Sequence, residues 1–108
     1  MKGFGEQYKS KNKSNKKTKP PKEQIINQAS KWFYMSGGKA PVPMVIRLII
    51  GRGWGQGPQH SQSLEAMFAH IPGLKVVAPS NARDAKGLLV SSVKDDGPVI
   101  FFEHRWLH

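Results

Sequence analysis

Cysteine is absent from this chain of 108 residues, and acidic residues are scarce, with seven Asp and Glu against 17 Lys and Arg. Without thiols, the chain can form neither disulfide bonds nor thiolate-ligated metal sites. No apolar run approaches the roughly 20 residues that a helix needs to cross a bilayer. A signal peptide is not indicated either, because Phe4 is followed by lysines and polar residues. The sequence therefore predicts one small domain from a reducing compartment.

Positive charge is concentrated at the amino end. Residues 1–22 contain eight lysines and only Glu6 as an acid, a net charge of +7, whereas residues 23–108 carry +3. After Tyr8 this segment lacks aromatic, Val, Ile, Leu and Met side chains, so it cannot bury enough apolar surface to offset the entropy of ordering. We expect a disordered, lysine-rich tail. It is either a polybasic arm for nucleic acid or anionic lipid or a solubilising extension, and its lack of arginine favours the extension.

The body, residues 23–108, alternates segments with helical and strand character. Strands and helices that alternate through short connections predict an α/β fold. We expect three parallel strands with helices packed on them. Such a sheet has two free edges, so we expect it to be part of a larger sheet and to associate with itself when alone. The predicted helices cover 23–35, 61–70 and 81–94, and the predicted strands cover 43–50, 74–78 and 98–102.

Each predicted helix has an apolar stripe that should face the sheet. We interpret these side chains as core residues rather than as a cofactor site. Ser80 is the expected N-cap of the third helix. The three stripes are Ile25, Ala29, Trp32 and Phe33; Leu64, Met67, Phe68 and Ile71; and Ala85, Leu88, Leu89 and Val93.

Glycine occupies every second position of residues 51–57, directly after the first predicted strand, and His60 follows. Glycine lets a backbone approach a ligand closely, although this spacing matches neither a Walker loop nor a dinucleotide fingerprint. The carboxyl ends of parallel strands share one edge, where open α/β sheets bind ligands. The glycine segment with His60, the turn 78–80 and residues 103–104 should therefore meet there. His60 is thus a candidate site residue, with a structural or capping histidine as the alternative.

Five segments of the body share their order and spacing with one known family: IINQASKWFYMSGG, VPMVIR, GWGQGPQHSQSLEAMFAHIPGLKVVAPS, DAKGLL and DDGPVIFFEH. From about Gln24 to His108 the chain resembles the beta subunit of the thiamine-diphosphate-dependent component of 2-oxoacid dehydrogenase complexes, such as pyruvate dehydrogenase. The matching region is the second half of the transketolase-like pyrimidine-binding domain. The resemblance therefore implies a partial domain of this kind over residues 23–108.

The resemblance also implies an activity and partners. Such enzymes are oxidoreductases that decarboxylate a 2-oxo acid on thiamine diphosphate and pass the acyl group to a lipoyl carrier. The implied partners are the alpha subunit, which holds the diphosphate and Mg²⁺, and the lipoyl acyltransferase core. The implied location is the cytoplasm, or a mitochondrion or plastid in a eukaryote.

Two kinds of site residue follow from the resemblance. His60, between Gln59 and Ser61, would lie in the active site and face the cofactor and the acyl acceptor. A monovalent cation, K⁺ for example, would bind through backbone carbonyls around Ser92, Val93 and Asp95, with the Asp95 carboxylate also available, because a hard cation prefers oxygen ligands.

The sequence also departs from the family pattern. The glutamate that bonds the cofactor's aminopyrimidine ring belongs to the first half of the domain, where this sequence has its lysine-rich segment. Cofactor-binding residues of this chain are therefore unknown, and without that carboxylate the chain alone should be inactive. The segment after Gly51 also differs from the Gly-Pro-x-Gly of pyruvate enzymes, which leaves the oxo acid open.

Three functional interpretations remain. The first is a fragment or truncated form of such a beta subunit. The second is a non-catalytic interaction module that binds polyanions through its basic tail. The third is a metal site at His104 and His108, four residues apart as helical ligands would be, but no third ligand is evident.

Overall fold

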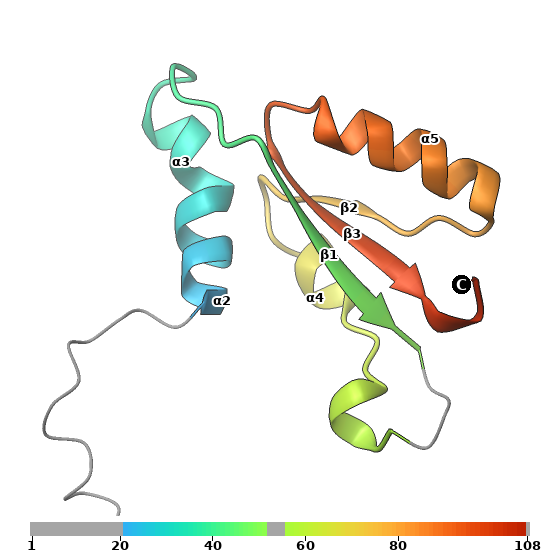
Figure 1. Ribbon diagram of the computed structural model, residues 1–108. Helices are drawn as coiled ribbons and strands as arrows, with labels where there is room; N and C mark the ends of the chain where they lie inside the picture. The colour runs from blue at the N-terminus through green and yellow to red at the C-terminus, as the bar shows by residue number, and fades with distance from the viewer. Residues whose placement is uncertain (1–20, 52–55, 108) are drawn as a thin grey trace, which may run out of the picture.

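The architecture is an α/β fold built on a three-stranded parallel sheet (Figure 1). The computed structural model describes residues 21–51 and 56–107. The strands β1 (Met44–Ile50), β2 (Lys75–Val77) and β3 (Pro98–His104) are arranged in the order β1-β3-β2. The predicted fold class and parallel pairing are confirmed. The predicted disordered tail lies outside the described residues except for its last two positions.

β3 lies in the centre of the sheet although it comes last among the three strands. It pairs in parallel with β1 along the whole of that strand and with all three residues of β2. The side chains of Val99–Phe102 are between 0 and 2% exposed. A strand that is covered on both faces and both edges must be apolar on both faces, and this burial explains the run PVIFF.

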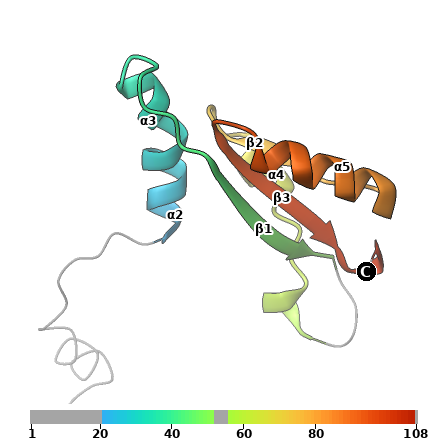
Figure 2. The same ribbon diagram turned by 45° about the horizontal axis from the view of Figure 1, so that its top comes forward.

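Helices cover both faces of the sheet. α5 (Ala82–Val93) lies on one face, and α4 (Glu65–Ala69) lies on the other with the first helix (Figures 1 and 2). The core on the α4 face forms around Phe68 and Phe102, whose ring centroids are 5.9 Å apart. This layering leaves the carboxyl ends of the strands as one edge of the sheet, where a site can form between loops.

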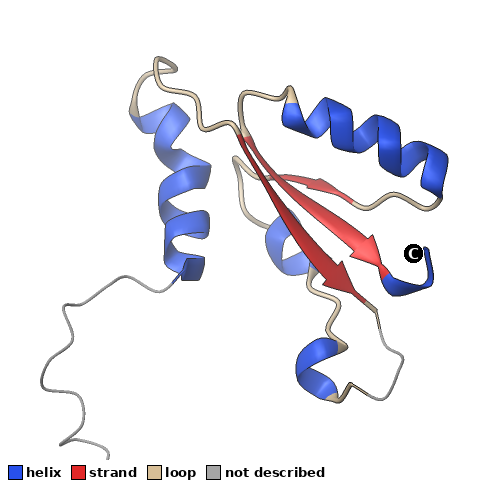
Figure 3. Cartoon of the chain, in the orientation of Figure 1, coloured by secondary structure: helices blue, strands red, loops and turns tan. Residues whose placement is uncertain are grey.

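The first helix is one continuous structure (Figure 3). It consists of α2 (Pro21–Glu23), a π-helical segment (Gln24–Ala29) and α3 (Ser30–Met35). It begins two residues before the predicted start and ends at the predicted residue.

The apolar stripe predicted for this helix is confirmed only in its first half. Ile25 packs against the core, but Trp32 and Phe33 are 51% and 52% exposed. A π-helical turn takes one more residue than an α-helical turn, so the residues that follow it rotate away from an α-helical stripe. Ser30 is buried in their place, and its hydroxyl donates to the carbonyl of Ile26.

The second helix is shorter than the predicted range 61–70, because only α4 is helical. Ahead of it, the Gln62 carbonyl accepts a hydrogen bond from the Gly51 N–H at 3.3 Å, so the chain here is bonded to the end of β1. A helix of this length turns little more than one row of side chains toward the sheet. Phe68 is buried and Ile71 half-buried, whereas Leu64 and Met67 are exposed, contrary to the predicted stripe.

α5 begins one residue after the predicted start, and its N-cap differs from the prediction. Asn81, not Ser80, caps it: the Asn81 side-chain oxygen accepts from the Asp84 N–H at 2.8 Å. The helix lies on the sheet along one row of side chains, and the predicted residues on either side of that row are exposed. The row comprises Ala85, Leu89 and the buried Ser92; Leu88 and Val93 are exposed.

β3 extends two residues beyond the predicted strand end, so Glu103 and His104 belong to the strand. The helical spacing that suggested a metal site is therefore wrong for His104, and His108 lies outside the described residues. Among the described residues, no three or more His, Cys, Asp or Glu side chains gather as metal ligands would. The same part of the chain contains no helix long and apolar enough to cross a membrane.

Candidate active site

A hollow of about 420 Å³ lies at the carboxyl ends of β1 and β3, beside the segment that contains His60. The apolar part of its lining comes from the end of β1, from Leu64 and from Phe102. The polar part consists of Arg47, Gln59, His60, Gln62 and Arg105. The hollow therefore has an apolar floor with cationic and neutral hydrogen-bonding groups around it, which is the usual composition of a ligand site.

His60 is the last residue of a short 3₁₀ turn, Pro58–His60, and is exposed. The Ser61 N–H donates to the Pro58 carbonyl at 3.5 Å within this turn. The expectation that a helix begins within two residues of His60 is wrong, because α4 begins at Glu65.

Arg105, which sequence reasoning did not single out, links the end of β3 to this turn. Its Nη2 donates to the His60 carbonyl at 2.8 Å, and its Nη1 donates to the side-chain oxygen of Gln56. The two acceptors are 45 and 49 positions from Arg105 in the sequence. No local pattern predicts so distant a pairing; the only available signal is an arginine directly after the last strand.

The residues expected to share one edge are divided between two hollows. A second hollow, of about 240 Å³, lies under α5 and is lined by Pro79, Glu103 and His104 among others. His60 lines only the larger hollow of these two, and Arg47 lines both. The turn 78–80 therefore does not meet His60.

The arginine that interrupts the apolar strand β1 has a charged partner. Arg47 Nε donates to Glu103 Oε1 on the neighbouring strand, and the Glu103 side chain is 13% exposed. This hydrogen bond and the charge of Glu103 raise the pKa of Arg47, so the guanidinium remains charged. Nearby, the Ser63 hydroxyl lies 2.7 Å from Glu65 Oε2 and lowers the pKa of that carboxyl.

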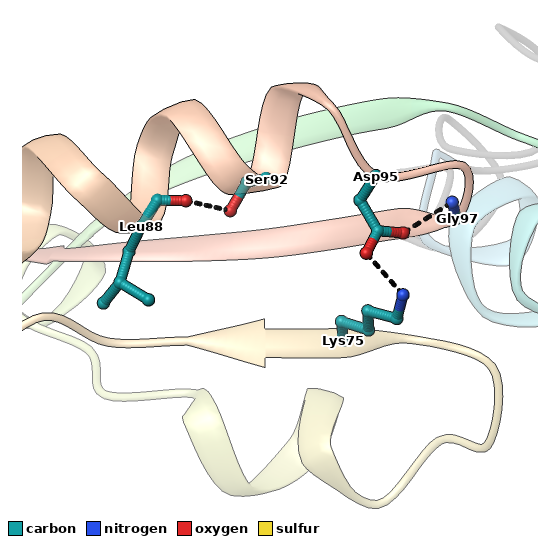
Figure 4. A network of polar contacts seen from close by, with 5 residues as sticks. All are labelled: Lys75, Leu88, Ser92, Asp95 and Gly97. Carbon is teal, nitrogen blue, oxygen red and sulfur yellow. Dashed lines mark hydrogen bonds and ion pairs between the residues drawn. The ribbon is translucent and has the colours of Figure 1, made fainter.

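The predicted cation site lies at the turn after α5 (Figure 4). Asp95 Oδ2 is 2.5 Å from Lys75 Nζ, and Oδ1 accepts from the Gly97 N–H at 2.7 Å. The Ser92 hydroxyl donates to the Leu88 carbonyl at 2.7 Å. The Asp95 carboxylate is thus already bonded to an ammonium group, and these side chains do not fit a cation in this arrangement. The main-chain carbonyls of Ser92, Val93 and Asp95 remain as ligands for the predicted site, and that of Ser92 also accepts from the Asp95 N–H at 3.3 Å.

The described residues do not by themselves fit thiamine diphosphate. The family resemblance implies that activation of this cofactor requires a carboxylate beside its aminopyrimidine ring. No Asp or Glu from the described part of the chain lines the larger hollow. Glu103, the nearest acid along β3, is bonded to Arg47.

Comparison with known proteins identifies the family. The description "Transketolase, pyrimidine binding domain" belongs to a family model that matches residues 15–108. The chain is a member of this family. The match begins inside the segment 1–22 that we predicted as a separate tail.

This pyrimidine-binding domain is similar to beta subunits of known enzymes. It is 55% identical over 86 residues to the acetoin:2,6-dichlorophenolindophenol oxidoreductase subunit beta of Cupriavidus necator. It is 52% identical to the mitochondrial pyruvate dehydrogenase E1 component subunit beta of Caenorhabditis elegans and 48% identical to that of Homo sapiens, each over 86 residues. These matches cover 80% of this chain and 24 or 25% of each relative. The chain spans about a quarter of the length of the relatives it matches.

Proposed function

We propose that this pyrimidine-binding domain contributes the histidine of an acyl-transferring, thiamine-diphosphate-dependent dehydrogenase. The observation that carries the proposal is the position of His60, exposed on the wall of a hollow at the carboxyl ends of β1 and β3. There the imidazole can exchange a proton with an acyl acceptor such as a lipoyl thiol, because its ring nitrogens can both donate and accept hydrogen bonds. When bound, thiamine diphosphate supplies the decarboxylation chemistry.

The cofactor and its Mg²⁺ are held by other parts of the enzyme under this proposal. The absence of a carboxylate from the described lining of the hollow supports this division. The chain alone is then inactive and acts with an alpha subunit and a lipoyl acyltransferase core. The location is the cytoplasm of a bacterium or a mitochondrion or plastid of a eukaryote.

The substrate is a 2-oxo acid of the pyruvate type, with acetoin as the alternative. The alternative is favoured by one observation: the Cupriavidus necator relative, named for acetoin, is at least as similar to this chain as the pyruvate enzymes described above. The two substrates are distinguished by turnover of an assembled enzyme with each of them in turn.

A chimeric beta subunit tests the role of His60. In it, the 86 matching residues of the Cupriavidus necator subunit are replaced by those of this chain, and the product is assembled with the alpha subunit of that enzyme. His60→Ala should leave thiamine diphosphate binding intact and reduce acyl transfer to lipoyl about 10²-fold or more. Reduction of 2,6-dichlorophenolindophenol, which needs no lipoyl acceptor, should fall much less.

His70→Ala is the matched control for this experiment, because His70 is an exposed histidine that does not line the hollow. It should change neither rate. Unchanged lipoyl acylation in His60→Ala would show that His60 is a structural histidine, and the proposal would be abandoned.

A cation at the turn after α5 is a separate proposal. Main-chain carbonyls of Ser92, Val93 and Asp95 would bind K⁺, while the Asp95 carboxylate stays bonded to Lys75. The test is thermal unfolding of the full chain in KCl and in choline chloride at equal ionic strength. A higher melting temperature in KCl supports the site, and equal temperatures contradict it.

A further inference from the structure

Arg105 connects the sheet to the two ends of one short segment. It begins the 3₁₀ turn that follows β3, Arg105–Leu107. Its two terminal nitrogens donate to the side chain of Gln56 and to the main chain of His60, four residues further along. A guanidinium group is planar and rigid, so these two bonds fix both the distance and the direction of the segment relative to β3.

Within residues 21–51 and 56–107, few other contacts hold this segment to the rest of the domain. All residues from Gln56 to His60 are exposed, and none belongs to the buried core. The other described hydrogen bonds nearby are a local one from the Ser61 N–H to Pro58 and the 3.3 Å bond between Gly51 and Gln62. The position of His60 therefore depends strongly on Arg105.

The environment of the guanidinium indicates that global stability is not its main role. Arg105 Nε is buried, and no acceptor lies within hydrogen-bonding distance of it among the described residues. A buried donor without an acceptor is unfavourable, and this offsets part of what the two Nη bonds contribute. The loss of Arg105 should consequently release the segment more than it weakens the fold.

We propose that Arg105 is a positioning residue that fixes the main chain of His60 at the wall of the hollow. The proposal rests on the proposed function of His60. Displacement of a reacting group by about 1 Å can reduce a rate about 10²-fold, so release of the segment reduces turnover while the part of the hollow lined by β1 remains. This positioning depends on the two-pronged shape of the guanidinium group. A lysine ammonium is a point charge and would not fix the direction of the bound segment.

Backbone order parameters of the full 108-residue chain, from ¹⁵N relaxation, test the mechanical half of the proposal. Residues 56, 57 and 59–61 should be rigid in the parent chain, with order parameters of about 0.8, and these values should fall below about 0.6 in Arg105→Ala. Pro58 has no N–H and is not observed. Arg105→Lys should lie between them, and Arg83→Ala, an exposed arginine of α5, should resemble the parent. Equal values in all four chains would overturn the proposal.

Gln56→Ala keeps this test decisive if Arg105→Ala also destabilises the fold. It removes one acceptor of the guanidinium from an exposed position, so the fold should be unaffected. Residues 57–61 should become more mobile, and the effect should not add to that of Arg105→Ala, because Arg105→Ala already removes the bond to Gln56. Mobility of residues 57–61 equal to that of the parent would contradict the proposal.

Turnover of the chimeric enzyme tests the functional half. Arg105→Ala should reduce lipoyl acylation at least about tenfold with the KM for the substrate that the chimera turns over, acetoin or a 2-oxo acid, unchanged, and Arg105→Lys should recover part of the rate. If His60→Ala is fully active, the proposed function fails, whatever Arg105 does. If His60→Ala is inactive and Arg105→Ala is fully active, only the positioning role fails.

Discussion

The imidazole of His104 lies over the backbone of Gly51. A Cβ atom on residue 51 would stand 2.6 Å from His104 Nε2 and 2.9 Å from Cε1, and Gly51 has a φ of +92°. The imidazole is held in place because its Nδ1 accepts from the Trp106 N–H at 3.3 Å. The ends of β1 and β3 thus pack together at a position where no side chain can be accommodated.

Gly51→Ala should destabilise the domain. The contact with His104 and the positive φ should together lower the free energy of unfolding by about 1–3 kcal/mol, as overpacking and left-handed strain do. Urea denaturation measures this change. Gly87→Ala is the control: its Cβ would contact nothing within 4 Å, and alanine is the better helix former. A Gly51→Ala chain as stable as the parent would contradict the geometry.

The Lys75–Asp95 pair should make stability depend on pH in acid. The hydrogen bond from Lys75, then that from the Gly97 N–H, lowers the pKa of Asp95. A carboxyl whose pKa is lower in the folded than in the unfolded state stabilises the fold at pH values above its unfolded-state pKa. This contribution is lost as the pH falls through its folded-state pKa. The parent should therefore be more stable than Asp95→Asn at pH 7, and the difference should shrink below about pH 4.

Thermal unfolding from pH 7 to pH 2 measures this dependence. Asp96→Asn, at the exposed neighbouring position, is the control and should not change the profile. If the difference between the parent and Asp95→Asn is the same at all pH values, the carboxylate does not contribute as described.

The free edge of β1 should mediate self-association of the isolated chain. Ile49 is 60% exposed on this edge strand, and unpaired apolar edges pair with other chains. Ile49→Lys should shift sedimentation toward the monomer. Val90→Lys, at a 49% exposed position on α5, should not. A parent chain that is monomeric at all concentrations would refute this prediction.

The lysine-rich segment should account for any binding of polyanions. Any DNA binding by the full chain should be weak, and the logarithm of its binding constant should fall linearly with the logarithm of the salt concentration. Removal of residues 1–20 leaves the first helix from Pro21 intact and should abolish this binding. DNA binding that survives the deletion would place the binding surface on the body instead.

Much of the fold follows from the sequence because the strands have a strong local pattern. The apolar runs predict all three strands to within two residues at each end. The buried faces of the helices are less predictable, because an α-helical period does not hold for every helix. The π-helical segment rotates Trp32 and Phe33 into solvent and buries Ser30, and nothing in the local apolar pattern indicates this change of phase.

The candidate site was predictable only in part. The position of His60 at the edge of the sheet follows from a strand, a glycine segment and parallel topology. The link to Arg105 depends on contacts 45 positions apart, and such contacts have no periodic signature. The strand ends line two separate hollows because their side chains lie on different faces of the sheet. A prediction of parallel strands does not determine these faces.

The central place of β3 has a consequence for synthesis on the ribosome. Met44 pairs with Pro98, which is made 54 positions later. At roughly 5–20 residues per second, β1 waits about 3–11 s for its partner. During that interval an apolar segment with unpaired main-chain groups is exposed outside the ribosome. Until β3 is made, β1 is prone to pair with other chains, because the strand that covers it in the folded domain is missing.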